Sequence, residues 1–242
     1  MTILTVSGLA KHYGRLPVLR DVDLAIGAGR TTAILGPNGA GKTTLIKAML
    51  GLTSADRGQI LLRDRPLGED PALRASIGYM PQIARFPENL TGAELIAMLT
   101  DLRGPRPKLD RELVDRFRLG TELSASLRTL SGGTRQKVNA ILAFLFSPEL
   151  LILDEPTAGL DPIASGVLKD KIREDRAKGK TFVLVSHVMS ELEELADDVV
   201  FLVDGTVRFA GALTDLKLRT RQLSLERAVA QLMRPSTASE AS

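Results

Sequence analysis

The residues with the clearest chemical meaning in this chain are nine consecutive positions, Gly36-Pro37-Asn38-Gly39-Ala40-Gly41-Lys42-Thr43-Thr44. They fit the pattern G-x-x-x-x-G-K-[ST] at every fixed position. In such a loop the backbone N–H groups surround phosphate oxygens, the lysine reaches the β- and γ-phosphates, and the next hydroxyl binds Mg²⁺. We therefore expect the loop to bind the phosphates of a nucleotide, with Lys42 on the β- and γ-phosphates and Thr43 on Mg²⁺.

The residues on either side of the loop support this reading. Thr32-Ala33-Ile34-Leu35 is a short apolar run of the kind that forms a buried strand, and residues 44–52 show helical spacing of apolar side chains. A strand that leads through a glycine-rich turn into a helix directs free N–H groups and the positive end of the helix dipole at one place. A glycine-rich turn without a ligand is the alternative, and the spacing and flanks argue against it.

A second group of chemical interest is the pair Asp154-Glu155, which follows the apolar run Leu150-Leu151-Ile152-Leu153. Such a run predicts a central parallel strand whose carboxyl end faces a ligand crevice. Asp154 is then placed to hold Mg²⁺, and Glu155 to orient and deprotonate a water that attacks the γ-phosphate. An acidic turn before Pro156 is the alternative.

A third candidate is the segment Leu130-Ser131-Gly132-Gly133, which precedes a predicted helix. Ser131 is a good N-cap, and the two glycines leave backbone amides exposed at the helix start, so the segment could bind a second anion. An ordinary capped helix after a flexible turn explains the segment equally well when it is considered alone.

Composition limits the class of protein. The chain has 242 residues, of which 44% are hydrophobic and 25% charged, which suits one α/β domain with an inserted subdomain. Cysteine is absent, which excludes disulfides and thiolate metal sites, and two histidines argue against a histidine-rich metal site. The net charge of +3 identifies no polyanionic partner, and an aromatic content of 4% without tryptophan argues against stacking on nucleic acid. We expect no direct contact with nucleic acid.

The sequence also bears on location. The N-terminus lacks the pattern of a signal peptide, and no apolar run approaches the roughly 18 residues of a spanning helix. We therefore expect the chain to lie on the cytoplasmic side.

The elements that must position these residues follow from periodicity and turn signals. Strands are predicted near residues 4–6, 22–26, 32–35, 59–62, 77–80, 150–153, 181–185, 199–203 and 207–209. Helices are predicted from Thr91, over residues 110–119, 131–146 and 163–178, and after a capping box at Ser190. This order predicts an α/β core, residues 1–82 and 148–211, interrupted by a helical subdomain, residues 83–147. Amphipathic helices are predicted over residues 213–233 and a disordered tail over residues 235–242.

Taken in order, these motifs resemble those of the nucleotide-binding subunit of ATP-binding cassette (ABC) transporters, from about residue 3 to residue 211. The resemblance implies an α/β fold: a P-loop NTPase (RecA-like) core with an N-terminal antiparallel β subdomain and the inserted helical subdomain. It implies one ATP-binding domain over residues 1–222 that hydrolyses ATP to ADP and phosphate, with ATP and Mg²⁺ bound.

The resemblance also gives roles to residues that would be unremarkable alone. Tyr13 is similar to the aromatic residue that stacks on adenine, and Gln82 to the glutamine that contacts Mg²⁺ and the attacking water. Residues 130–133 match the signature motif, Asp161 the D-loop, and His187 the switch histidine near the γ-phosphate. Without the resemblance, Tyr13 would be a core aromatic, Gln82 a solvated loop residue, Asp161 a helix cap and His187 a structural histidine.

In the same family Glu155 corresponds to the catalytic base and residues 150–155 to Walker B. One position departs from the pattern: Thr134 stands where the family often has glutamine. Because Ser131 and the glycine amides contact phosphate, we expect Thr134 to tune the site without disabling it.

The resemblance further implies partners. The signature of one subunit closes over ATP held by another, so we expect a homodimer or a pairing with a similar subunit, on the cytoplasmic face of the cell membrane. A separate membrane permease would dock in a groove near Gln82, lined by Ile83, Phe86 and Leu90, although these three could equally be core. The motifs are most similar to the ABC-2 exporter branch, and residues 134–146 to ATPases of nitrous-oxide reductase maturation and copper handling. A regulator of a membrane partner without transport, or a nucleic-acid-related ABC ATPase, is the alternative.

Overall fold

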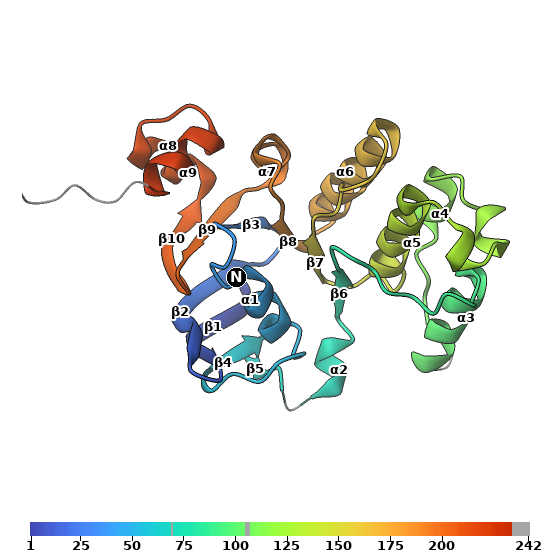
Figure 1. The fold of residues 1–242 in the computed structure, drawn as a ribbon, viewed down its shortest axis with the longest axis horizontal. Coiled ribbons are helices and arrows are strands. Elements are labelled where there is room, and N and C mark those ends of the chain that lie inside the picture. The colour runs from blue at the N-terminus through green and yellow to red at the C-terminus, as the bar shows by residue number, and fades with distance from the viewer. Residues whose placement is uncertain (69, 105–106, 234–242) are drawn as a thin grey trace, which may run out of the picture.

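The computed structural model describes residues 1–68, 70–104 and 107–233, and contains two β-sheets flanked by helices (Figure 1). The predicted tail, residues 235–242, lies outside this described part. The first sheet has four antiparallel strands in the order β2-β1-β4-β5. Its strands are β1 (Thr2–Tyr13), β2 (Leu16–Gly27), β4 (Arg57–Leu62) and β5 (Arg65–Pro66).

The second sheet has six strands in the order β10-β9-β3-β8-β7-β6. All neighbouring pairs are parallel except β9 and β10, which form a hairpin. Its strands are β3 (Thr31–Leu35), β6 (Ile77–Met80), β7 (Leu150–Asp154), β8 (Thr181–Val185), β9 (Asp198–Val203) and β10 (Thr206–Ala212). The predicted α/β class with an antiparallel β subdomain is confirmed.

The helices of the described chain lie on the faces and at both ends of this sheet (Figure 1). The helices are α1 (Lys42–Met49), α2 (Pro71–Arg74), α3 (Gly92–Leu102), α4 (Glu112–Arg116), η1 (Glu122–Ser124), η2 (Leu127–Thr129), α5 (Gly132–Phe144), α6 (Pro162–Ala177), α7 (Met189–Leu195), α8 (Leu213–Thr220) and α9 (Leu225–Met233). Figure 1 shows α3, α4 and α5 gathered at one end and α8 and α9 at the other. None of the helices within the described ranges combines the length and the apolar character that a membrane crossing requires.

The six-stranded sheet separates two hydrophobic cores because successive side chains of a strand point to opposite faces. In β7, Leu151 and Leu153 pack with α5 and α6, whereas Leu150 and Ile152 pack with α1 and the antiparallel sheet. The helices α3, α4 and α5 belong to the first of these cores together with the sheet, so the helical segment has no core of its own. The predicted division at residues 83 and 147 stays a prediction.

Three element predictions need correction. The helix predicted over residues 110–119 is only α4, and the capping box predicted at Ser190 is wrong, because α7 begins at Met189 and no side chain caps it. The strands predicted near residues 4–6 and 22–26 are each 12 residues long. Shifts in the β1–β2 register interrupt the alternation of apolar residues, which hid the length of both strands.

The hairpin between β9 and β10 ties the two sheets to each other and to the phosphate loop. Its turn residues Asp204 and Gly205 have φ of 49° and 75°. The Gly205 N–H donates to the Ala40 carbonyl at 3.1 Å, and the Gly205 carbonyl accepts from the Arg20 N–H at 2.8 Å. A β-carbon at Gly205 would lie 2.4 Å from the Val18 carbonyl oxygen, so only glycine fits this contact.

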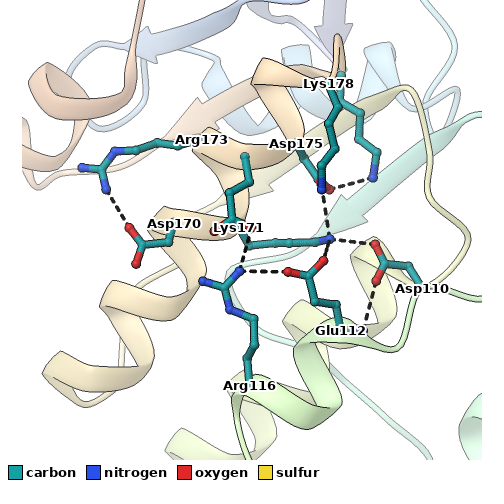
Figure 2. Close-up of polar contacts among 10 residues, drawn as sticks. Asp110, Glu112, Arg116, Asp170, Lys171, Arg173, Asp175 and Lys178 are labelled. Atoms are coloured by element: carbon teal, nitrogen blue, oxygen red, sulfur yellow. Dashed lines mark hydrogen bonds and ion pairs between the residues drawn. The ribbon is translucent and has the colours of Figure 1, made fainter.

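A buried ion cluster joins the helical segment to α6 (Figure 2). The Lys171 side chain is 1% exposed, and its Nζ lies 2.8 Å from Asp110 Oδ2, 2.6 Å from Glu112 Oε2 and 3.3 Å from Asp175 Oδ1. Burial alone lowers the pKa of Lys171, but the hydrogen bonds to Asp110 and Glu112 outweigh it and leave the pKa raised. The Lys171 ion cluster (these four residues) therefore fixes the segment before α4 against the core.

Candidate functional site

A cleft of about 370 Å³ opens at the carboxyl ends of the parallel strands β3, β7 and β8. The residues that line it come from the phosphate loop, from β2, and from the segments that follow β6, β7 and β8. They are Leu16, Val18, Asn38, Gly39, Ala40, Gly41, Lys42, Thr43, Thr44, Gln82, Asp154, Glu155, Val185 and His187. Open α/β sheets bind ligands at this edge, because the loops that leave the strands meet there.

The phosphate loop is a tight turn between β3 and α1. The Lys42 Nζ lies over the loop and donates to the carbonyl oxygens of Gly36 at 2.6 Å and Pro37 at 3.0 Å. Gly36 has φ of 153°, and a β-carbon there would lie 2.1 Å from the Leu202 carbonyl oxygen. The loop is therefore pressed against β9 at a distance that only glycine permits. Burial lowers the pKa of Lys42, while the charges of Asp154 and Glu155 act in the opposite direction.

The two carboxylates at the end of β7 face this ammonium group across the cleft. Asp154 is 9% exposed and Glu155 is 8% exposed. Burial raises the pKa of Asp154, against the charges of Lys42 and His187, and burial likewise raises the pKa of Glu155, against the charge of His187. Buried carboxylates beside a lysine are typical of sites that handle charge and protons.

Glu155 has an unusual geometry for its residue type. Its φ is 50°, in the left-handed region, and its N–H donates to the Val185 carbonyl at 2.7 Å. One carboxylate oxygen, Oε2, accepts from the Ser186 hydroxyl at 3.3 Å. The other, Oε1, is buried without a hydrogen-bond partner in the described chain, and the His187 Nε2 lies 3.6 Å from it. A strained residue with an unsatisfied buried oxygen is the kind of group that a bound ligand or water completes.

These residues fit a nucleotide with Mg²⁺. The loop supplies backbone amides and one ammonium group for phosphate, and hydroxyl, amide and carboxylate oxygens line the same cleft. In the described part of the chain no three His, Cys, Asp or Glu side chains gather as a metal cage.

The comparisons with known proteins agree with this site. The family model for ABC transporter matches residues 19–158. The chain is 32% identical over 205 residues to the lantibiotic transport ATP-binding protein SrtF of Streptococcus pyogenes. The matched residues cover 85% of this chain and 89% of that protein. The chain belongs to the ABC transporter family. It is an ATPase of that family.

Two further ABC proteins are similar to this chain. The chain is 33% identical over 208 residues to the Nod factor export ATP-binding protein I of Ralstonia nicotianae, covering 84% of this chain and 65% of that protein. A solved structure of the ATP binding subunit of an ABC transporter superposes with a TM-score of 0.90 at 34% identity, over 96% of this chain and 100% of the other.

Most of the residues that the ABC motifs single out meet in the cleft. Residues 38–44, Gln82, Asp154, Glu155 and His187 all line it. Tyr13 does not: it is 50% exposed at the end of β1, with the Lys11 Nζ 5.6 Å from its ring centroid. Tyr13 pairs in register with Leu16, which does line the cleft, so it stands beside the opening. Its stacking on adenine stays a prediction.

The ABC signature residues are not among the described residues of this cleft. Ser131, Gly132 and Gly133 lie at the start of α5, where the Ser131 Oγ accepts from the Thr134 N–H at 3.1 Å. The hydroxyl oxygens of Ser131 and Thr134 lie 2.8 Å apart, so the residue that departs from the family pattern contacts the signature serine directly.

The Asp161 side chain acts as a helix cap in this chain. It accepts from the Ala164 N–H at 2.8 Å and pairs with the Lys137 Nζ at 3.0 Å. The helix cap, which was the alternative role for the Asp161 side chain, is therefore what the structure shows. A contact with nucleotide through the D-loop stays a prediction.

Sequence reasoning missed Leu16, Val18 and Val185, which form the apolar part of the cleft. Leu16 and Val18 are two residues apart on β2 and so point to the same face. That spacing was the available signal, but two aliphatic residues on a strand more often mark a core than a ligand site.

Proposed function

We propose that this chain is the ATP-hydrolysing subunit of an ABC-2 type exporter and drives a separate membrane permease. The observation that carries this proposal is the meeting of the phosphate loop, Gln82, Asp154, Glu155 and His187 in one cleft. Export is supported by the relatives, since the Nod factor protein is described as an export ATP-binding protein. Within that branch, we propose a copper-handling ATPase of nitrous-oxide reductase maturation. The support for this sub-family is the similarity of residues 134–146.

In this proposal each residue of the cleft has one task. Thr43, Gln82 and Asp154 would hold Mg²⁺, which when bound would offset the negative charge of the phosphates. Lys42 exchanges the Gly36 and Pro37 carbonyls for phosphate oxygens. Glu155 would take a proton from the attacking water, and His187, whose Nε2 lies 3.6 Å from Glu155 Oε1, would contact the γ-phosphate.

The signature residues would act on a second copy. Ser131 and the amides of Gly132 and Gly133 start α5 with free donors, and Ser131 and Gly132 are exposed. We propose that they cap the far end of ATP bound by a partner subunit, so that ATP joins two chains head to tail. Because ATP would contact both chains only when they meet, it shifts the equilibrium toward the closed dimer.

The permease would dock on the flank of β6. An apolar depression of about 290 Å³ lies there, lined by Tyr79, Leu99, Leu102 and Phe146 among others. Leu102 is 77% exposed and Ile83 is 73% exposed, whereas Phe86 and Leu90 are partly buried against the hydrophobic core. Of the three residues predicted to line a docking groove, only Ile83 is thus free for a partner, and we assign the groove to the β6 flank instead.

Association with a membrane protein tests this proposal. The chain, expressed in its own host, should co-purify with a multi-span membrane protein that raises its rate of ATP hydrolysis. Leu102→Glu should lose that association while the basal rate is kept, and Leu223→Glu is the matched control, because Leu223 is 92% exposed outside the β6 flank.

The results separate the two candidate functions. No partner, with full ATP hydrolysis, would contradict a transport role. A partner that changes its activity while no cargo moves would favour the regulator instead.

A further inference from the structure

The helix α5, which begins at the signature residues, carries two buried amide side chains on one face. Gln136 is 7% exposed and Asn139 is 2% exposed. Burying an amide costs free energy unless its donors and acceptors are hydrogen-bonded. The hydrogen-bond partners of these two side chains therefore indicate their role.

The partners are the backbone of the two catalytic loops of the same chain. The Asn139 Nδ2 donates to the carbonyl oxygen of Pro81, the residue before Gln82, at 2.8 Å. It also donates to the Gln136 Oε1 at 3.3 Å. The Gln136 Nε2 in turn donates to the carbonyl oxygens of Glu155 at 3.3 Å and Pro156 at 3.4 Å. One run of hydrogen bonds, the amide bridge of Gln136 and Asn139, thus connects the Gln82 segment to the turn that carries Glu155.

That turn needs support from outside. Glu155 is held at φ of 50°, which is unfavourable for a residue other than glycine and persists only where its surroundings fix it. Its carbonyl accepts from the Ala158 N–H at 3.1 Å as well as from Gln136. The bridge therefore contacts the backbone of this turn and not the carboxylate itself.

The same helix also contacts the far end of the Glu155 loop, just before α6. Lys137, between the two amides, pairs with Asp161 at 3.0 Å. Gln136 and Lys137 thus contact the two ends of the β7–α6 loop, and Asn139 contacts the loop after β6. A helix in that position can hold the two loops at a fixed distance from one another.

We propose that Gln136 and Asn139 are positioning residues for ATP hydrolysis, holding the Glu155 turn and the Gln82 segment in register with the start of α5. This rests on the proposed function, in which Glu155 is the base and Ser131 contacts the nucleotide of a second copy. It follows that a movement of Ser131 on the partner's nucleotide is passed through α5 to the catalytic turn of its own chain.

The test uses near-isosteric apolar variants of the full chain. Gln136→Met and Asn139→Leu remove the amides but keep the volume, and the double variant removes both neighbouring partners at once. Val138→Ala is the matched control, because Val138 lies between them, is 1% exposed and loses only packing. The rate constant kcat, the ATP affinity and the melting temperature are measured for each, alone and combined with Glu155→Gln.

We expect Gln136→Met to lower kcat roughly ten- to hundredfold, since a small displacement of a catalytic group is enough for that. The ATP affinity should stay within about twofold, because the phosphate loop is untouched. In the Glu155→Gln background, Gln136→Met should lower kcat no further, because the effects of substitutions in residues that act as a unit are not additive. An equal loss of kcat in Val138→Ala, or full additivity with Glu155→Gln, overturns the proposal.

Amide hydrogen exchange decides the same question without catalysis. Exchange at residues 154–158 should be faster in Gln136→Met, and at residues 81–84 in Asn139→Leu, with neither change in Val138→Ala. Unchanged exchange in both amide variants overturns the proposal, whatever the rate of hydrolysis. A wild-type chain that turned over no ATP would instead contradict the proposed function.

Discussion

At the scale of single residues, the proposed function depends on one carboxylate held in an unfavourable backbone conformation. Glu155 combines burial, a left-handed φ and an oxygen without a hydrogen-bond partner in the described chain. It lines the same cleft as Lys42 and His187, so in that proposal it is the proton acceptor.

Replacing that carboxylate should separate binding from hydrolysis. Glu155→Gln keeps the size of the side chain but removes the base, so we expect ATP hydrolysis to slow by roughly 10²–10⁴. Binding of a fluorescent ATP analogue should be unchanged, because the phosphate loop supplies those contacts. A variant that hydrolyses ATP at the wild-type rate would remove Glu155 from this role. Lys42→Ala is the opposite control, in which we expect binding itself to be lost.

At the scale of elements, the helical segment is attached to the sheet by packing and by the Lys171 ion cluster (Figure 2). The ion pairs of this cluster are shielded from water around Lys171, because the Lys171 side chain is only 1% exposed. An ion pair of this kind is costly to break, because removing one partner leaves the other charge buried.

We expect Lys171→Met to destabilise the chain by up to about 3 kcal/mol, since Asp110 loses the ammonium group it pairs with, whereas Asp175 keeps Lys180 at 2.6 Å. Unfolding in urea measures this free energy. Lys169→Met, on the same helix, breaks the pair with Glu194 near the surface and should cost only about 0–1 kcal/mol. Equal effects of the two variants would show that the Lys171 ion cluster has no special role.

The same cluster should give a dependence of stability on pH. The hydrogen bond from Lys171 lowers the pKa of Glu112 from 4.5 to about 2, so the folded chain binds this proton less tightly than the unfolded chain does. The stabilisation from Glu112 is therefore complete above pH 4.5 and is lost as the pH falls toward 2. The difference in melting temperature between wild type and Glu112→Gln should shrink over that range. A difference that stays constant down to pH 2 would contradict the assignment.

Sequence reasoning found the elements whose signals are local. The phosphate loop, the Asp154-Glu155 pair and the Thr91 capping box are contiguous or nearly so, and the structure has all three where the spacing placed them. It could not find contacts between distant segments. Lys171 is 61 residues from Asp110 along the chain, and Asn139 is 58 residues from Pro81. Nothing in either local pattern indicates that these residues meet.

At the scale of the whole molecule, one chain holds only half of the contacts that the proposed function requires. The signature residues begin α5 and are not among the described residues of the cleft, although α5 touches the cleft loops through Gln136 and Asn139. A second copy would bring its own signature to the open side of the phosphate loop.

We therefore expect Glu155→Gln to form a dimer in Mg·ATP, because ATP bound between two chains is no longer hydrolysed. Sedimentation with and without nucleotide measures this. Adding Ser131→Arg should return the chain to a monomer, since a long charged side chain would occupy the place of the phosphate contact. A dimer that persists with Ser131→Arg, or that forms without nucleotide, would contradict the head-to-tail arrangement.

At the tip of the β9–β10 hairpin, Gly205 donates a hydrogen bond to Ala40 of the phosphate loop and packs closely against the Val18 backbone. The hairpin therefore supports the phosphate loop. In a library of random substitutions selected for activity, position 205 should tolerate as little change as the loop itself. Variants there would be classed as nucleotide-site defects, although Gly205 is not among the described residues that line the cleft and lies far along the polypeptide from Lys42.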